Sequence, residues 1–61
     1  MPNLTQKELT AIQDQLQAEK ILIDKLRAYS ELSQDQTIKN TCAGWADKHQ
    51  QHYDKLIKLL G

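Results

Sequence analysis

The chain has 61 residues, of which 39% are hydrophobic, 26% are charged and 5% are aromatic. A chain of this length buries only about 60% of the surface that it exposes when unfolded, which excludes a large enzyme with its own deep cleft. Eight basic residues balance eight acidic ones. This zero formal charge disfavours nucleic acid as a partner, because nucleic-acid-binding proteins are held largely by positive charge.

Nothing in the sequence indicates a membrane or secreted protein. No apolar run approaches the roughly 18 residues of a membrane span. The N-terminal residues Met1-Pro2-Asn3 lack the basic-then-apolar pattern of a secretory signal. We therefore expect a soluble, cytoplasmic protein. The single cysteine, Cys42, cannot form a disulfide within one chain, so stability has to come from packing, a metal ion or a second chain.

A first helix is expected over about residues 6–32. Thr5 followed by Glu8 is the pattern of a capping box, and Leu4 and Leu9 occupy the hydrophobic-staple positions around it. From Leu9 onward, apolar residues recur at intervals of three and four, which is typical of a helix packed against other helices. These positions are Leu9, Ile12, Leu16, Ile23 and Leu26, widened on one side by Leu22 and Tyr29.

A turn is expected at about residues 33–35, where Ser33 and Asp35 are two good N-cap candidates. A second helix is then expected over about residues 36–60. Gly44 lies within it, where glycine costs about 1 kcal/mol relative to alanine, and the close approach of a neighbouring helix is the simplest explanation. The apolar positions of this helix are Ile38, Cys42, Trp45, Leu56 and Leu59, widened by Ala46, Tyr53 and Leu60.

Two apolar faces of this width predict an all-α antiparallel hairpin that cannot cover its hydrophobic surface alone. Two such hairpins packed face to face form a four-helix bundle, the smallest arrangement that covers all these positions. The sequence therefore predicts a homodimer whose interface is built from the apolar positions of both helices. An extended two-stranded coiled coil is the alternative, and the break in periodicity at residues 33–35 disfavours it.

Three ionisable residues occupy apolar positions of this pattern, namely Glu19 in the first helix and His49 and His52 in the second. Glu19 precedes Ser33 by fourteen residues and His49 follows Asp35 by fourteen, so an antiparallel hairpin places them at the same level. His52 follows one turn beyond His49 on the same face. The sequence thus predicts one carboxylate and two imidazoles in one layer of the bundle.

Three interpretations of this layer remain open, because a buried carboxylate or imidazolium needs partners. A glutamate with two histidines is a ligand set for zinc or non-haem iron. Without any metal, the same residues can form a hydrogen-bonded layer that fixes the register of the helices. In the third interpretation, the dimer opens here and the residues line a hydrated gap.

The segments 18–23 (AEKILI) and 46–53 (ADKHQQHY) resemble the ferritin-like helical hairpins of the spore coat protein F group of spore-forming bacteria. The resemblance covers nearly the whole chain. In ferritin-like carboxylate proteins, a glutamate on one helix joins a Glu-x-x-His motif on the next to hold two metal ions. Glu19 matches the first of these and His52 matches the histidine of the motif. His49 stands where the motif has glutamate, so the bridging carboxylate of a di-iron oxidase is missing.

The resemblance implies a half of a ferritin-like bundle, rebuilt by dimerisation, that serves as a structural, coat-associated protein of sporulation. Its partners would include other coat proteins, and catalysis is not required. One alternative is a small metal-binding or redox protein with a working site at Glu19, His49 and His52. A second alternative is a helical adaptor that recruits another protein through its outer face, on which Ile21 and Ile57 are the apolar residues.

Overall fold

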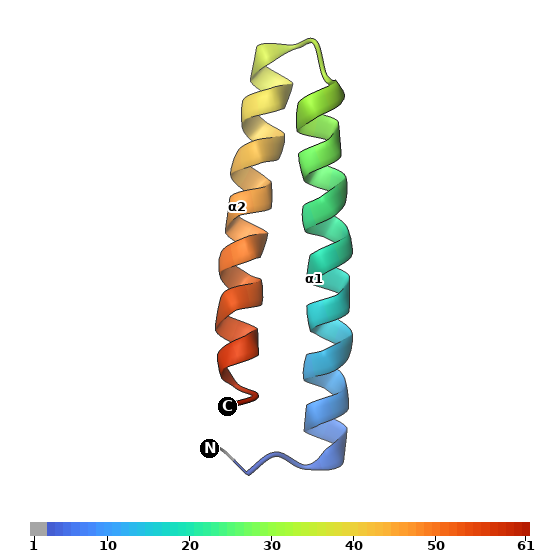
Figure 1. Cartoon of the computed structure of the whole chain (residues 1–61), viewed down its shortest axis with the longest axis vertical. Coiled ribbons are helices and arrows are strands. Elements are labelled where there is room, and N and C mark those ends of the chain that lie inside the picture. Colours follow the sequence, from blue (N-terminus) through green and yellow to red (C-terminus); the bar gives the residue numbers. More distant parts are fainter. Residues whose placement is uncertain (1–2) are drawn as a thin grey trace.

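The computed structural model describes residues 3–61; Met1 and Pro2, which belong to the segment inspected above for a secretory signal, lie outside the described residues. The chain forms two α-helices, α1 (Gln6–Leu32) and α2 (Gln36–Lys58). They run antiparallel, side by side, so that α1 begins at the same end of the hairpin at which α2 ends (Figure 1). Residues 3–61 contain no strand. The expected all-helical hairpin is confirmed.

The first helix begins at the cap that the sequence predicts. The backbone N–H of Glu8 donates to Thr5 Oγ1 (3.1 Å), and the backbone N–H of Thr5 donates to Glu8 Oε1 (3.0 Å). This capping box satisfies two backbone donors that would otherwise have no partner at the start of a helix. The helix ends at Leu32, after which the backbone N–H of Ser33 donates to the carbonyl of Tyr29 (3.0 Å).

Side chains from both helices hold the connecting loop. The backbone N–H of Ile38 donates to Asp35 Oδ1 (3.1 Å), which makes Asp35 the N-cap of α2. Lys39 Nζ donates to the carbonyls of Ser30 (3.0 Å) and Glu31 (3.2 Å), and Ser30 Oγ donates to the carbonyl of Lys39 (2.8 Å). The last turn of α1 has no basic residue of its own, so Lys39 supplies the positive charge that a helix C-terminus favours.

The second helix ends two residues earlier than the sequence pattern predicts. The backbone N–H groups of Leu59 and Leu60 donate to the carbonyls three residues earlier, at Leu56 (3.0 Å) and Ile57 (3.1 Å). This spacing is that of a 3₁₀ turn, which often tightens the end of an α-helix. Gly61 follows with a φ of 113°, in the region that favours glycine.

A thin apolar core lies between the two helices. Its most buried hydrophobic residues are Ile23, Leu26, Cys42 and Ala46, which are at most 8% exposed. Further along the hairpin, the half-buried residues between the helices are Leu9, Ile12, Leu16, Tyr53, Leu56 and Leu60. No large side chain among residues 3–61 is fully buried, because two helices cover each other on one side only.

The expected apolar stripe of α2 divides into two groups. Cys42 is buried and Leu56 half-buried, whereas Ile38, Trp45 and Leu59 are 50%, 54% and 44% exposed. Positions that the pattern places at the margin of the stripe, including Ala46 and Tyr53, take part in the packing instead. The side of α2 that packs against α1 is rotated by about one position from the expected stripe, onto Cys42, Ala46, His49, Tyr53 and Leu56. On α1, Leu22 and Tyr29 are likewise 37% and 57% exposed.

The prediction that a neighbouring helix approaches closely at Gly44 is wrong for the hairpin. Gly44 is exposed, and nothing lies within 4 Å of the position that a Cβ would occupy there. Gly44 lies between the buried residues Cys42 and Ala46 in the sequence, and two helical steps of 100° place it on the outer side of α2.

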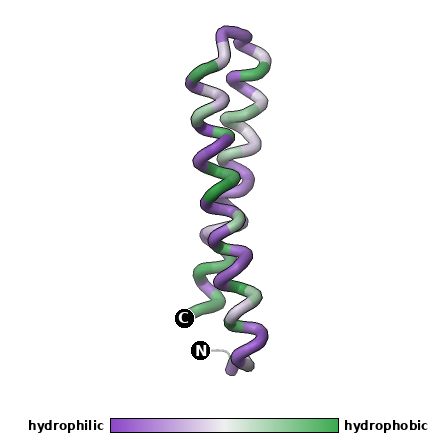
Figure 2. The backbone as a smooth tube through the Cα atoms, turned by 90° about the vertical axis from the view of Figure 1, so that its right-hand side faces the viewer, coloured by the Kyte–Doolittle hydropathy of each residue, from purple (hydrophilic) through white to green (hydrophobic). Residues whose placement is uncertain are grey.

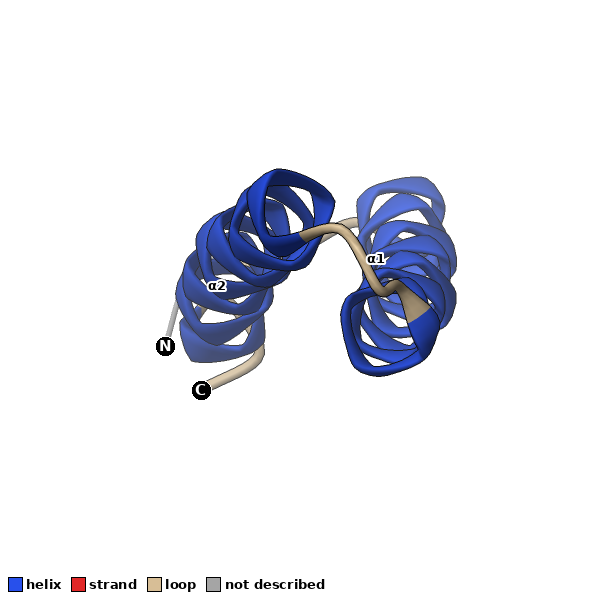
Figure 3. Ribbon diagram, turned by 90° about the horizontal axis from the view of Figure 1, so that it is seen from above, coloured by secondary structure: helices blue, strands red, loops and turns tan. Residues whose placement is uncertain are grey.

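Hydrophobic residues recur at intervals along both helices and form no long continuous run (Figure 2). Neither α1 nor α2 has the length and hydropathy that crossing a bilayer demands. Seen from above, each helix meets the other on one side and faces solvent on the rest (Figure 3). The molecule measures 46 × 15 × 11 Å, which is the shape of one thin layer of helices.

Candidate metal site

Glu19 of α1 and His49 and His52 of α2 form one cluster between the helices. One ligand atom from each residue can be chosen so that all three lie within 4.8 Å of one another. His49 Nδ1 donates to Glu19 Oε2 (2.7 Å), and His52 Nδ1 lies 3.9 Å from Glu19 Oε1. The two imidazole rings are perpendicular, with centroids 5.3 Å apart. The structure thus brings together the three residues that the sequence pattern singles out.

The local helix geometry explains how these side chains meet. Glu19 follows Leu16 by three residues and precedes Ile23 by four, so it lies on the side of α1 that packs against α2. His49 and His52 are three residues apart, and side chains at this spacing stack along one side of a helix. Because the helices are antiparallel, equal numbers of residues from the loop bring Glu19 and His49 to the same level.

The exposure of the cluster increases from Glu19 to His52. The side chain of Glu19 is 9% exposed, that of His49 is 30% exposed and that of His52 is 55% exposed. Gln15 Nε2 donates to Glu19 Oε1 (3.1 Å), so both carboxylate oxygens accept a hydrogen bond. Gln15 is a member of the cluster that the apolar pattern does not single out. Its position four residues before Glu19 on the same helix is the signal that could have found it.

Glu19 is an anion at neutral pH. Burial by itself raises the pKa of its carboxyl, but hydrogen bonds from His49 and Gln15 and the attraction of both imidazoles outweigh burial and hold that pKa below its ordinary value. Since His49 Nδ1 donates to this anion, Nδ1 carries a hydrogen. In the neutral form of His49, Nε2 therefore keeps the free lone pair.

The three residues lie near one another but are spread more widely than the ligands of a bound transition-metal ion, with ligand atoms up to 4.8 Å apart. Two ligand atoms bound to Zn²⁺ at about 2.0–2.1 Å in tetrahedral geometry lie about 3.3 Å apart. The distance of 2.7 Å from Glu19 to His49 is shorter than this and the distance of 3.9 Å from Glu19 to His52 is longer. Both distances therefore need to change by roughly half an ångström. His49 Nδ1 also has to lose the hydrogen that it donates to Glu19 before it can bind an ion. Two histidines and one carboxylate also form the ligand set of non-haem Fe²⁺.

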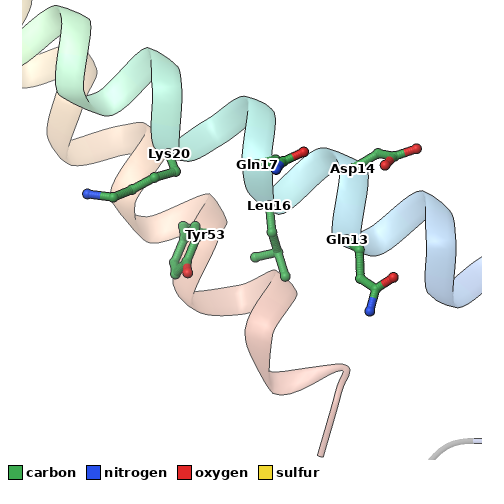
Figure 4. A pocket seen from close by; sticks show the side chains of 6 residues that line it. All are labelled: Gln13, Asp14, Leu16, Gln17, Lys20 and Tyr53. Carbon is green, nitrogen blue, oxygen red and sulfur yellow. The ribbon is translucent and has the colours of Figure 1, made fainter.

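A hollow in the surface lies beside this cluster and does not add ligands to it. Leu16 of α1 and Tyr53 of α2 lie between the helices there, and polar side chains surround them (Figure 4). It is a shallow groove lined by Gln13, Asp14, Leu16, Gln17, Lys20 and Tyr53. Cys42 is also separate, because it is buried in the core with Leu26 and Ala46, two turns before His49.

Comparison with known proteins finds no match for the chain among protein-family models, curated proteins or solved structures. The candidate site is therefore defined by its own geometry, by the three residues Glu19, His49 and His52.

Proposed function

We propose that this protein is a small structural helical-bundle protein, active as a homodimer, that binds one zinc or iron ion per chain at Glu19, His49 and His52. The observation that carries the proposal is the proximity of one anionic carboxylate and two imidazoles from two helices, within 4.8 Å. An ion held by both helices links them near mid-length. Because a single hairpin has only a thin core, such a link stabilises the folded state by mass action.

We propose a structural ion in preference to a redox centre. A di-iron centre of the ferritin-like kind uses bridging carboxylates, and each of its Glu-x-x-His motifs supplies one. In this chain His49 stands at the glutamate position, so Glu19 is the single carboxylate of the cluster. One carboxylate and two histidines suit a single ion with one open position for water or another group.

We further propose that the protein associates with other coat proteins in spore-forming bacteria. The two segments that resemble the spore coat protein F group, residues 18–23 and 46–53, are the segments that carry Glu19, His49 and His52. Expression confined to sporulation supports this setting. Steady expression in growing cells contradicts it.

The metal proposal is tested by elemental analysis of protein purified without an affinity tag, followed by titration with Zn²⁺ and with Fe²⁺ under anaerobic conditions. We expect about one ion per chain and a melting temperature that rises with the free metal concentration. At a metal concentration of a hundred times the dissociation constant, the free energy of unfolding should increase by about 2.7 kcal/mol. Glu19→Gln and His52→Ala should lose most of this effect. Asp47→Asn, which removes an exposed carboxylate outside the cluster, should keep it.

A wild-type protein that carries no metal, and whose melting temperature does not respond to either ion, would overturn the metal proposal. The cluster would then be a hydrogen-bonded layer that fixes the register of the helices. In that case Glu19→Gln changes stability without any dependence on added metal.

A further inference from the structure

One side of the hairpin carries exposed apolar residues that the contact between α1 and α2 does not use. On α2 and its C-cap, Ile38, Trp45, His52 and Leu59 follow one another at steps of seven residues, and His52 is the one polar member of this series. On α1, Leu22 and Tyr29 also lie seven residues apart. These side chains are between 37% and 57% exposed. We call this surface the apolar flank. It consists of Leu22, Tyr29, Ile38, Trp45, His52 and Leu59.

The contacts of Glu19 place the two stripes on the same side of the hairpin. Glu19 Oε1 accepts a hydrogen bond from Gln15 and lies 3.9 Å from His52 Nδ1, so Gln15 and His52 share one side. Leu22 and Tyr29 follow Gln15 at steps of seven, which keeps them on nearly the same side of α1. The opposite side is marked by a shallow groove lined by Lys20, Ile23, Gln50 and Tyr53.

The α1 and α2 residues of the apolar flank also lie at matching levels along the hairpin axis. Glu19 lies opposite His49, and the helices are antiparallel. Leu22, three residues after Glu19, therefore lies about level with Trp45, four residues before His49. By the same count, Tyr29 lies about level with Ile38. The apolar flank thus runs from His52 toward the loop on both helices, and Leu59 alone extends it beyond the cluster.

The exposed area of the chain indicates how much surface a partner would cover. The chain exposes 4799 Å². A compact monomer of 7.0 kDa is expected to expose about 4,000 Å². The excess of roughly 800 Å² equals the area that each partner buries in a protein–protein interface of standard size. A second copy of the chain removes this excess, whereas a small ligand does not.

The spacing within the apolar flank favours a helix as the covering element. A stripe of period 3.5 residues stays in contact with another helix that winds gently around it. Within α2 the stripe from Ile38 to His52 covers 14 residue steps, or about 21 Å of helix, and Leu59 follows at the C-cap. Eight positive and eight negative charges leave no net repulsion between two copies.

We infer that two copies of this chain associate through the apolar flank, and that this contact covers His52 and closes the exposed side of the Glu19–His49–His52 cluster. The inference rests on the proposed homodimer and names the face that forms it. In a two-fold dimer whose axis crosses the middle of the α2 stripe, Trp45 of one copy and His52 of the other come to the same level. Exposure of the cluster then depends on self-association.

Leu59→Glu and Ile57→Glu form a matched pair for testing the face. The two side chains are 44% and 45% exposed in the same turn. Leu59 belongs to the apolar flank, whereas Ile57 follows Gln50 by seven residues and lies on the groove side. By sedimentation equilibrium of the full chain, Leu59→Glu should raise the dimer dissociation constant at least about tenfold, because it places a charge in a desolvated contact. Ile57→Glu should change it less than about threefold.

Trp45 supplies an independent readout, since it is the single tryptophan of the chain. It is 54% exposed in the hairpin and covered in the inferred dimer. Its fluorescence emission should therefore shift to shorter wavelength as the concentration of wild-type protein or Ile57→Glu rises, but not for Leu59→Glu at the same concentrations. Circular dichroism of each variant checks that the helices are intact. If either variant unfolds, the same comparison can be made with Leu22→Gln, which lies in the apolar flank, and its neighbour Ile21→Gln, which does not.

If Leu59→Glu and Ile57→Glu raise the dimer dissociation constant equally, or if Ile57→Glu alone raises it, the assignment of the face is wrong but the protein is still a dimer. A wild-type monomer at about 1 mM chain, where even a weak dimer forms, would overturn the dimer and the face together. Zinc content per chain, measured on the same samples, reports separately on the proposed metal site. Release of zinc to a chelator should be faster from Leu59→Glu than from Ile57→Glu.

Discussion

At the scale of single residues, Glu19 carries the main polar cost of the fold. A carboxylate within an apolar stripe destabilises a protein unless it is hydrogen-bonded. Glu19 accepts one bond from His49 on the opposite helix and one from Gln15 on its own helix. Sliding one helix by a turn would separate Glu19 from His49 and leave the carboxylate without this partner. A hydrogen-bonded pair of this kind is a means of specifying helix register, and we propose that role for Glu19 and His49 if the cluster holds no metal.

The titration of Glu19 makes stability depend on acid pH. The folded-state pKa of Glu19 is lower than its ordinary value of 4.5, so its ionised form stabilises the fold above that pH. This contribution is lost as the pH falls through the lowered pKa. Glu19→Gln should cost about 1–2 kcal/mol at pH 7, and urea unfolding between pH 7 and pH 3 should show wild type and variant converging below about pH 4.5. A difference that does not change with pH would contradict this prediction.

Wild type has to be compared with Glu19→Gln because the carboxyl of Glu8 also titrates at acid pH. Its pKa is lowered by the hydrogen bonds with the backbone and side chain of Thr5, so part of the acid sensitivity of the wild type comes from the start of α1. Glu8 is the same in both proteins. The difference between wild type and Glu19→Gln therefore isolates the cluster.

Gly44 offers a substitution that should stabilise the protein. Nothing lies within 4 Å of the position of a new Cβ, and the residue is helical and exposed. Alanine loses less backbone entropy on folding than glycine does, so Gly44→Ala should raise the free energy of unfolding by roughly 0.5–1 kcal/mol. Chemical denaturation of the two proteins at equal concentration measures the change. A destabilised Gly44→Ala would show that another chain packs against this position.

At the scale of elements, the ends of the helices are held by contacts of two kinds. The start of α1 and the start of α2 use local caps, Thr5 with Glu8 and Asp35 with Ile38. The end of α1 is held by Lys39 from the other helix, nine residues away from Ser30. Local caps form as soon as a helix does, whereas the Lys39 contact requires the hairpin to close. The Lys39 contact therefore stabilises the turn specifically.

Lys39→Ala should lower the free energy of unfolding by about 1 kcal/mol, because it removes two charge-assisted hydrogen bonds to carbonyls at the end of α1. Lys48→Ala is the matched control, since it makes the same change at an exposed position of α2. Thermal unfolding followed by circular dichroism measures both. If the two variants lose the same stability, the contact of Lys39 with Ser30 and Glu31 contributes nothing specific.

At the scale of the whole molecule, the hairpin is too thin to be covered by its own helices. Among residues 3–61, four apolar residues are at most 8% exposed, and the hairpin is only 11 Å across its shortest dimension. Small domains with a thin core often gain stability from a metal ion, a disulfide or a second chain. A lone Cys42 provides no disulfide within the chain, so the proposed ion and the proposed dimer answer the same physical requirement.

A homodimer predicts that stability depends on concentration. Each tenfold increase in chain concentration should add about 1.4 kcal/mol to the free energy of unfolding a dimer, so its melting temperature should rise by several degrees. Differential scanning calorimetry over two decades of concentration measures this. A melting temperature that stays constant over that range would show that the single hairpin is the folding unit.

Much of the local structure could be predicted from the sequence. The capping box at Thr5 and Glu8, the N-cap at Asp35 and the break at residues 33–35 act within a few residues along the chain, so pattern and composition reveal them. The equal spacing of Glu19 and His49 from the loop likewise follows from counting residues along helices of known rise. The sequence by itself therefore determined the two helices, their reversal and the level at which the polar residues meet.

Only the tertiary structure decided how far each helix is rotated about its own axis. Trp45 and Ala46 are neighbours in the sequence and both fit an apolar stripe, yet Trp45 is 54% exposed and Ala46 is 0% exposed. The same rotation placed Gly44 on the outer side. Periods of 3.5 and 3.6 residues cannot be told apart over a short helix, so the packing of one helix against the other, not the pattern along either, chooses which residues face inward.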